Sequence, residues 1–173
     1  GRKTLKLANS FEMRRGGVLN AVEVAYETWG ELNAAGDNAV LIFTGLSPSA
    51  HVTSSQEDPA PGWWEQMVGP SRPLDTRKYF VICANSMGSC FGSTGPASIN
   101  PQTGEPYRLA FPVLSLEDIA TAGKLLVEHL GVAQLEAVVG PSMGGMTSLA
   151  FAALFPEMSR RLLIISSGPR TLP

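Results

Sequence analysis

Short runs of hydrophobic residues recur along the chain and predict strands that alternate with helices. Four runs, at residues 39–43, 79–84, 135–139 and 162–165, are apolar at nearly every position, which predicts central parallel strands buried on both faces. Residues 18–29 alternate instead, and they predict a half-buried, antiparallel strand near a sheet edge. The inner face of that strand would carry Val22, Val24, Tyr26 and Thr28.

Two stretches between these runs predict helices. Ser115 and Asp118 have the spacing of a capping box, and apolar residues at helical spacing follow until Gly131, a suitable stop. Residues 145–155 predict a second helix, which ends before Pro156. Strands that alternate with helices indicate an α/β protein with a mostly parallel sheet, and such sheets bind ligands beyond the carboxyl ends of their strands.

The segment Gly140-Pro141-Ser142-Met143-Gly144 connects a predicted strand to a predicted helix and has the pattern G-x-S-x-G. In that context the pattern is typical of a nucleophile elbow, a sharp strand-to-helix turn that exposes a serine hydroxyl. Glycines are needed because side chains at their positions would occupy the space of the tight turn. The alternative is a glycine-rich turn in which Ser142 merely caps the helix.

Ser142 needs a base and an orienting carboxylate to act as a nucleophile. In α/β hydrolases both follow the serine along the chain, whereas here only one acidic residue, Glu157, and no histidine follow it. His129 is placed at a predicted helix C-terminus, and His51 lies in a loop from which it could approach Ser142. The interpretation we favour is that residues 1–173 are the N-terminal part of a single α/β-hydrolase catalytic domain. Its lid and C-terminal strands would then be absent from this chain.

Two long loops, residues 44–62 and 85–112, leave the carboxyl ends of two central strands on the same rim as Ser142. Loops of this length in a compact domain are usually functional or disordered, and their aromatic residues and prolines favour the ordered walls of a cleft. The backbone N–H groups of Met143 and Leu46 are expected to form an oxyanion hole, Leu46 by its position alone.

The composition is that of an ordinary soluble globular protein, with 173 residues, 44% hydrophobic and 16% charged, and a net charge of −2. It gives no indication of nucleic acid or an anionic membrane as a partner, and no apolar run approaches the ~20 residues that a membrane span needs. Cys83 and Cys90 suit a reducing compartment, and no spacing of Cys or His indicates a metal site. We therefore expect a cytoplasmic protein without a bound metal.

Several further motifs, taken with the elbow, give the chain a specific resemblance over about residues 26–169. They are Gly62-Trp63-Trp64-Glu65, Gly69-Pro70, residues 74–83, Gly92-Ser93-Thr94-Gly95-Pro96, Pro101-Gln102-Thr103-Gly104 and Ser142-Met143-Gly144-Gly145-Met146. In these motifs the chain resembles the homoserine/serine O-acyltransferase family of α/β-hydrolase enzymes. Together they are far more discriminating than G-x-S-x-G.

The resemblance implies a two-step acyl transfer. Ser142 would attack an acyl-CoA thioester while the N–H groups of Met143 and Leu46 hold the oxyanion, and the acyl-enzyme would then pass its acyl group to an amino-acid hydroxyl. The product would be an activated ester for cysteine or methionine biosynthesis. Acyl-CoA is then a co-substrate and no cofactor is implied. The triad aspartate and histidine would lie beyond residue 173, and a homodimer is expected for the full-length protein.

The acceptor is expected to depend on Gly45, Leu46, Ser47 and Pro48, because the family sets its substrate choice in this segment. Homoserine-acetylating members typically have Ala-Leu-Thr-Gly there and glycine in place of Pro141, whereas Gly-Leu-Ser-Pro resembles members that succinylate serine. Pro48 would stiffen the loop, which suits an acceptor one methylene shorter. We expect L-serine and succinyl-CoA, with L-homoserine and acetyl-CoA as the alternative. One methylene discriminates only ~10–200-fold, so acceptance of both amino acids is compatible with this expectation.

Two other classes of function share the predicted fold. An esterase or thioesterase would use water as the acceptor in place of an amino acid. A non-catalytic α/β binding module, or an inactive fragment, would account for the missing base.

Overall fold

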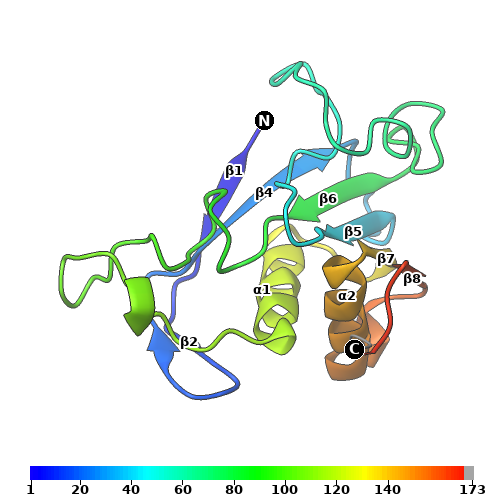
Figure 1. Cartoon of the computed structure of the whole chain (residues 1–173). Helices are drawn as coiled ribbons and strands as arrows, with labels where there is room; N and C mark the ends of the chain where they lie inside the picture. The colour runs from blue at the N-terminus through cyan, green and yellow to red at the C-terminus, as the bar shows by residue number, and fades with distance from the viewer. Residues whose placement is uncertain (170–173) are drawn as a thin grey trace.

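The computed structural model describes residues 1–169, which fold around a six-stranded sheet of order β1-β4-β6-β5-β7-β8 (Figure 1). Strands β6, β5, β7 and β8 are parallel, while β4 pairs antiparallel with β6 and β1 antiparallel with β4. The prediction of a mostly parallel α/β sheet is therefore confirmed. The strands are β1 (Lys3–Lys6), β4 (Glu23–Trp29), β5 (Ala39–Phe43), β6 (Phe80–Ala84), β7 (Leu135–Pro141) and β8 (Leu162–Ile165).

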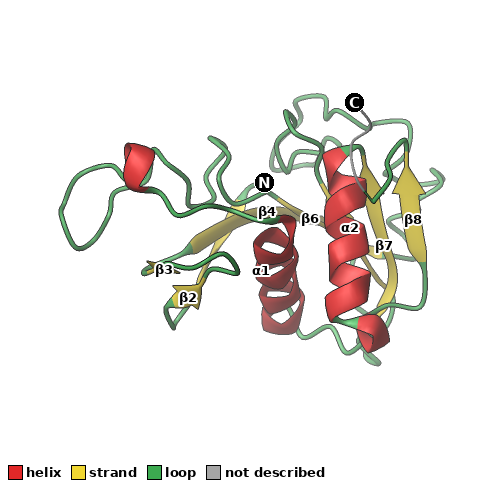
Figure 2. Ribbon diagram, turned by 60° about the horizontal axis from the view of Figure 1, so that its bottom comes forward, coloured by secondary structure: helices red, strands yellow, loops and turns green. Residues whose placement is uncertain are grey.

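Two helices, α1 (Leu116–His129) and α2 (Met143–Leu154), lie side by side on one face of the sheet (Figure 2). Helix α1 begins with the predicted capping box, in which the Ser115 hydroxyl and the Asp118 carboxylate each accept a backbone N–H bond from the other residue. Its chain leaves through Gly131 at φ +77°, a left-handed conformation that suits glycine. No helix within residues 1–169 has the length and hydropathy needed to cross a membrane.

The opposite face of the sheet is covered by loops. Alternate residues of the strands, Val40, Ile42 and Val81 among them, pack there against Ala50 and Val52 of the loop that follows β5. We call residues 44–62 the β5 loop and residues 85–112 the β6 loop. In Figure 1 the cyan β5 loop lies on the side of the sheet away from α1 and α2. The described fold thus has a helical layer, a sheet and a layer of irregular backbone.

The prediction for residues 18–29 is wrong in two respects. The stretch is divided into β3 (Val18–Leu19), which pairs with β2 (Phe11–Glu12), and β4, with Ala21 at φ 54° between them. Strand β4 is also buried on both faces, because Ala25 is 0% and Glu27 is 4% exposed. The outer face is covered because His51 of the β5 loop binds Glu27, while Ser93 of the β6 loop accepts a hydrogen bond from the Ala25 N–H.

The remaining helical elements are single turns, η1 (Arg108–Ala110) in the β6 loop and η2 (Pro156–Met158) after α2. The second turn begins where Pro156 ends the helix, as the sequence predicts. Strand β8 follows and leaves the adjacent residues Leu162 and Leu163 36% and 43% exposed.

Candidate active site

Ser142 stands between β7 and α2 in a backbone conformation that side-chain-bearing residues rarely adopt, with φ 54° and ψ −125°. The residue is exposed and its hydroxyl makes no capping bond to α2, which contradicts the interpretation of Ser142 as a plain helix cap. Its backbone is held on both sides, because its N–H donates to Ile165 O at 2.9 Å and its carbonyl accepts from the Gly145 N–H at 2.9 Å. A strained residue held this firmly is typical of a functional site.

The glycines of the motif are explained by close backbone approach. A Cβ on Gly140 would lie 2.1 Å from Gly144 O, and a Cβ on Gly144 would lie 2.2 Å from Phe43 O. Side chains at these positions would therefore overlap backbone atoms of α2 and β5. The first turn of α2 rests directly on the carboxyl ends of β7 and β5, and this contact directs Ser142 outward at the helix N-terminus, where negative charge is favoured.

The start of the β5 loop lies beside the elbow. An ideal Cβ on Gly45 would be 3.7 Å from Pro141 O, so the start of the loop lies close to the residue directly before Ser142. Leu46 is 81% exposed, and Ser47 is exposed as well. Within residues 1–169 the N–H groups of Leu46 and Met143 donate to no other group of the chain. Both predicted oxyanion donors are thus unused on the rim of the sheet.

The β6 loop is ordered by buried hydrogen bonds to β4. Ser93 Oγ accepts from the Ala25 N–H at 2.9 Å and donates to Asn85 O at 2.7 Å, while Thr94 Oγ1 accepts from the Glu23 N–H at 2.8 Å. The two loops also meet at the rim, where the hydroxyls of Thr44 and Ser86 lie 3.3 Å apart. These contacts order the β6 loop against β4 and join the starts of both loops at the carboxyl ends of β5 and β6.

Glu65 binds the C-terminal part of the β5 loop through hydrogen bonds. Its carboxylate accepts hydrogen bonds from the Gly62 N–H at 2.7 Å, the Ser54 N–H at 2.6 Å and the Thr53 hydroxyl at 2.9 Å. The Gly62 and Ser54 N–H groups in particular lower the pKa of Glu65 from 4.5 to about 2. The sequence motif around Trp64 includes Glu65, but its spacing gives no indication of this anchoring role.

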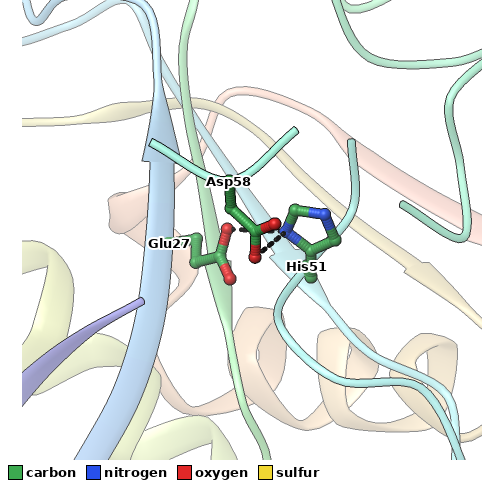
Figure 3. A group of neighbouring side chains, drawn as sticks. All are labelled: Glu27, His51 and Asp58. Atoms are coloured by element: carbon green, nitrogen blue, oxygen red, sulfur yellow. Dashed lines mark hydrogen bonds and ion pairs between the residues drawn. The ribbon is translucent and has the colours of Figure 1, made fainter. Parts of the chain in front are cut away.

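His51 does not serve Ser142 in this structure. Its Nδ1 lies 3.0 Å from Glu27 Oε2 and 3.8 Å from Asp58 Oδ2 (Figure 3). Its Nε2 lies 2.8 Å from Ala60 O. Partial burial alone would lower the pKa of His51, but the Ala60 carbonyl and the Glu27 carboxylate outweigh it and raise the pKa above its ordinary value. Both ring nitrogens are thus engaged away from the elbow.

The Glu27, His51 and Asp58 side chains also form a group whose potential metal-ligating atoms lie within 4.8 Å of one another. Sequence reasoning missed this group, because Glu27 and His51 belong to different elements 24 residues apart. Other residues singled out by sequence lie elsewhere. His129 is exposed in the last turn of α1, Cys83 is a buried thiol on β6, and Cys90 is exposed.

A cavity of about 600 Å³ lies away from the elbow, beside Thr28, Trp29, Glu65 and Arg72. None of the residues that line it belongs to the Ser142 turn or to residues 44–48, so its size does not make it the candidate site. The site is defined instead by the strained serine, the two unused N–H groups and the two loop walls.

Comparison with known sequences assigns most of the chain to one fold. The sequence profile of the alpha/beta hydrolase fold matches residues 38–172. A serine O-succinyltransferase of Litchfieldella anticariensis is 55% identical over 172 residues, which cover 99% of this chain and 47% of that protein. An L-serine/homoserine O-acetyltransferase of Streptomyces lavendulae is 57% identical over 169 residues, which cover 98% of this chain and 45% of that protein. The resemblance stated from the sequence is confirmed.

Solved structures repeat the arrangement of strands and helices. The homoserine O-acetyltransferase from Bacillus anthracis superposes with a TM-score of 0.92 at 33% identity, over 99% of this chain and 48% of that one. A solved esterase superposes with a TM-score of 0.85 at 36% identity, over 93% of this chain and 46% of that one. The chain spans about half the length of the curated relatives it matches.

Proposed function

The chain belongs to the family of proteins with the alpha/beta hydrolase fold, and from that premise we propose that the full-length protein is an acyl-CoA-dependent O-acyltransferase acting on an amino-acid hydroxyl. Ser142 is the proposed nucleophile. The observation that carries this proposal is the exposed, strained Ser142 at the N-terminus of α2, with the unused N–H group of Met143 next to it. The names of the serine and homoserine acyltransferases among the relatives support the acceptor class.

The reaction would proceed in two displacements. Ser142 Oγ attacks the thioester carbonyl, its proton passes to a base, and the base returns that proton to the sulfur as CoA leaves as the free thiol. The acceptor hydroxyl then attacks the acyl-serine ester, its proton passes to the same base, and the Ser142 oxygen regains a proton as it leaves. Each tetrahedral intermediate places negative charge on one oxygen, which the N–H groups of Met143 and Leu46 would stabilise. Loss of one such donor typically costs ~10²–10³ in turnover.

L-serine and succinyl-CoA are the proposed substrates. The serine O-succinyltransferase among the relatives supports this choice, as does the Gly-Leu-Ser-Pro segment at residues 45–48, whose exposed residues Leu46 and Ser47 lie at the start of the β5 loop. L-homoserine with acetyl-CoA is the second candidate, which the L-serine/homoserine O-acetyltransferase favours. That no cofactor takes part, that the protein is cytoplasmic and that it forms a homodimer remain predictions.

A hydrolase is the competing function, favoured by the similar solved esterase. The acceptor separates the two, since an esterase or thioesterase releases CoA at a rate independent of any amino acid. The decisive assay measures CoA release by the full-length protein from succinyl-CoA or acetyl-CoA, with and without L-serine or L-homoserine. CoA release that requires the amino acid supports the transferase. CoA release at the same rate with and without the amino acid overturns the proposal.

Replacement of the nucleophile gives the second arm of the test. Ser142→Ala should lower turnover by at least ~10⁴-fold and abolish the acyl adduct that intact-mass measurement detects without acceptor. Ser10→Ala, a change at an exposed serine in the loop before β2, is the matched control and should leave both unchanged. Parallel double-reciprocal lines for the two substrates would support the two-step order, and intersecting lines would contradict it.

A further inference from the structure

The interaction between His51 and Glu27 is a buried contact between segments that no backbone pairing joins. The His51 side chain is 14% exposed and that of Glu27 is 5% exposed. Glu27 belongs to β4, His51 belongs to the β5 loop, and β6 lies between β4 and β5 in the sheet. The contact between His51 and Glu27 therefore spans β6 and joins the loop to β4 (Figure 3).

The partners of the ring favour the imidazolium. Ala60 O can only accept a hydrogen bond, so Nε2 must carry a proton at a distance of 2.8 Å. Glu27 Oε2 is an acceptor in its ionised form, so Nδ1 carries a proton at 3.0 Å as well. Within residues 1–169 the Glu27 carboxylate has no other hydrogen-bond partner, and without the cation it would be a buried, uncompensated charge.

The same loop is fixed at its other end by the elbow. Thr44 is paired with Ser86 of the β6 loop, and its carbonyl oxygen lies 2.8 Å from the position of a Cβ on Gly144. A Cβ on Gly45 would lie 3.7 Å from Pro141 O. Only residues 46–50 lie between this end and His51. Leu46 is exposed and its N–H is unused, so its orientation depends on the two fixed ends that flank it.

We propose that His51 is a positioning residue for the acyl transfer: its imidazolium, bound to Glu27 on β4, fastens the β5 loop so that the Leu46 N–H stays directed toward the oxyanion of an intermediate on Ser142. The inference rests on the proposed function, because it assigns His51 a task in that reaction. His51 itself touches no reacting atom and acts only through the loop backbone.

We call the interaction between His51 and Glu27 the tether, and it depends on pH because it requires protonated His51. The groups that face it are the carboxylates of Glu27 and Asp58 and, in a shared cavity of about 360 Å³, the Arg2 side chain. Cys83 lies opposite Glu27 on β6, but burial, and then the Glu27 charge, raise the pKa of its thiol well above the ordinary value and keep it neutral. Because the pKa of His51 is raised on folding, the tether is complete at low pH and is lost as pH rises through the folded-state value.

The test compares the full-length wild-type protein with His51→Gln, using His129→Gln on the exposed last turn of α1 as the matched control. His51→Gln should lower kcat by ~10–100-fold, as expected for a displaced oxyanion donor, and change KM for the amino acid by less than ~3-fold. Both half-reactions should slow together, since each forms an oxyanion. His129→Gln should behave as wild type.

Two readouts separate positioning from simple loss of stability. Hydrogen exchange should become faster at residues 44–51 in His51→Gln, while residues 142–146 keep their protection. The wild-type rate should fall on the alkaline side through the titration of His51. Glu27→Gln should move that fall to lower pH, because the imidazolium loses its anionic partner.

Unchanged kcat in a folded His51→Gln, or exchange that increases equally over the whole chain, would overturn the inference. If His51→Gln does not fold, the test uses Asp58→Asn. This change removes the negative charge 3.8 Å from His51 Nδ1 but keeps an oxygen that can accept the Ala60 N–H, and it should move the alkaline limb by a smaller amount. Zn²⁺ could bind stoichiometrically to the wild type but not to His51→Gln, and added Zn²⁺ could restore activity after chelation. These two results together would overturn the inference and identify the group as a metal site. If the wild type transfers no acyl group, the proposed function fails, whereas the exchange of residues 44–51 still tests the tether.

Discussion

The elbow and the β5 loop flank the same candidate site but are specified in opposite ways. The elbow has its shape because side chains are missing at Gly140 and Gly144, where backbone atoms approach within 2.1 to 2.2 Å of any added Cβ. The β5 loop has its shape because charged side chains are present: His51 reaches Glu27 across 24 residues, and Glu65 reaches Ser54 across 11. The first is a local backbone motif, and the second is a long-range arrangement of ion pairs and hydrogen bonds.

This difference separates the tasks of the two regions. Ser142 keeps an unfavourable backbone conformation because its N–H bonds to Ile165 O on β8 and its carbonyl accepts from Gly145 of α2, and neither hydrogen bond involves a titratable group. The β5 loop lacks regular secondary structure and is held by hydrogen bonds of two ionisable side chains, His51 and Glu65. An enzyme of this design would hold its nucleophile, Ser142, rigidly. The position of its second oxyanion donor, the Leu46 N–H, would depend on the ionisation of the side chains that hold the loop.

The largest effect is expected for Gly144→Ala in the elbow. The new Cβ would lie 2.2 Å from Phe43 O and 2.8 Å from Thr44 O, both of them backbone atoms that cannot move aside alone. The free energy of unfolding should fall by about 3 kcal/mol, and activity should be lost. Chemical denaturation of the full-length protein measures the change.

Gly45→Ala in the β5 loop is the matched control for that substitution. Its Cβ would make ordinary contacts of 3.7 Å with Pro141 O and Pro48, and the residue has no positive φ. The unfolding free energy should change by less than about 0.5 kcal/mol. An equal loss of stability in both variants would show that the elbow is no more tightly packed than the loop.

The same contrast explains what could be predicted from the sequence. The central strands, the capping box at Ser115 and the strand-turn-helix around Ser142 depend on residues close in sequence, and all three are confirmed. The burial of Glu27 on the outer face of β4 was missed, because its partner lies in an irregular loop with no periodicity. The sequence suggests His51 only as a possible base, because it shows the residue type but not the direction of the side chain.

An intermediate effect is expected for Glu65→Gln, which tests the loop side of the comparison. The neutral amide keeps one acceptor but loses the charge that binds two N–H groups and a hydroxyl, so unfolding should be easier by about 1–2 kcal/mol at neutral pH. The folded-state pKa of about 2 lies below the ordinary 4.5, so the stabilisation is complete above 4.5 and is lost as pH falls toward 2.

Denaturation at several pH values checks this expectation, and the wild type and Glu65→Gln should converge in acid. Glu31→Gln is the control, because the Glu31 side chain is exposed and accepts no hydrogen bond within residues 1–169. A stability difference that stays constant from neutral pH to below 4 would rule out the ionised carboxylate as the anchor.

The smallest expected effect is the difference in stability between a glycine and an alanine substitution at the same position, and its sign should differ between the elbow and the β5 loop. At φ 54° and ψ −125°, glycine relieves strain that serine or alanine must bear, so Ser142→Gly should be about 1 kcal/mol more stable than Ser142→Ala, although both are inactive. In the β5 loop the order should reverse: Ser47 has no positive φ, and Ser47→Gly should be less stable than Ser47→Ala because glycine loses more backbone entropy on folding. Thermal unfolding of the four variants measures both differences. The same order at both positions would mean that the strain at Ser142 is not stored in its backbone, and the distinction between a strained elbow and a relaxed loop would fail.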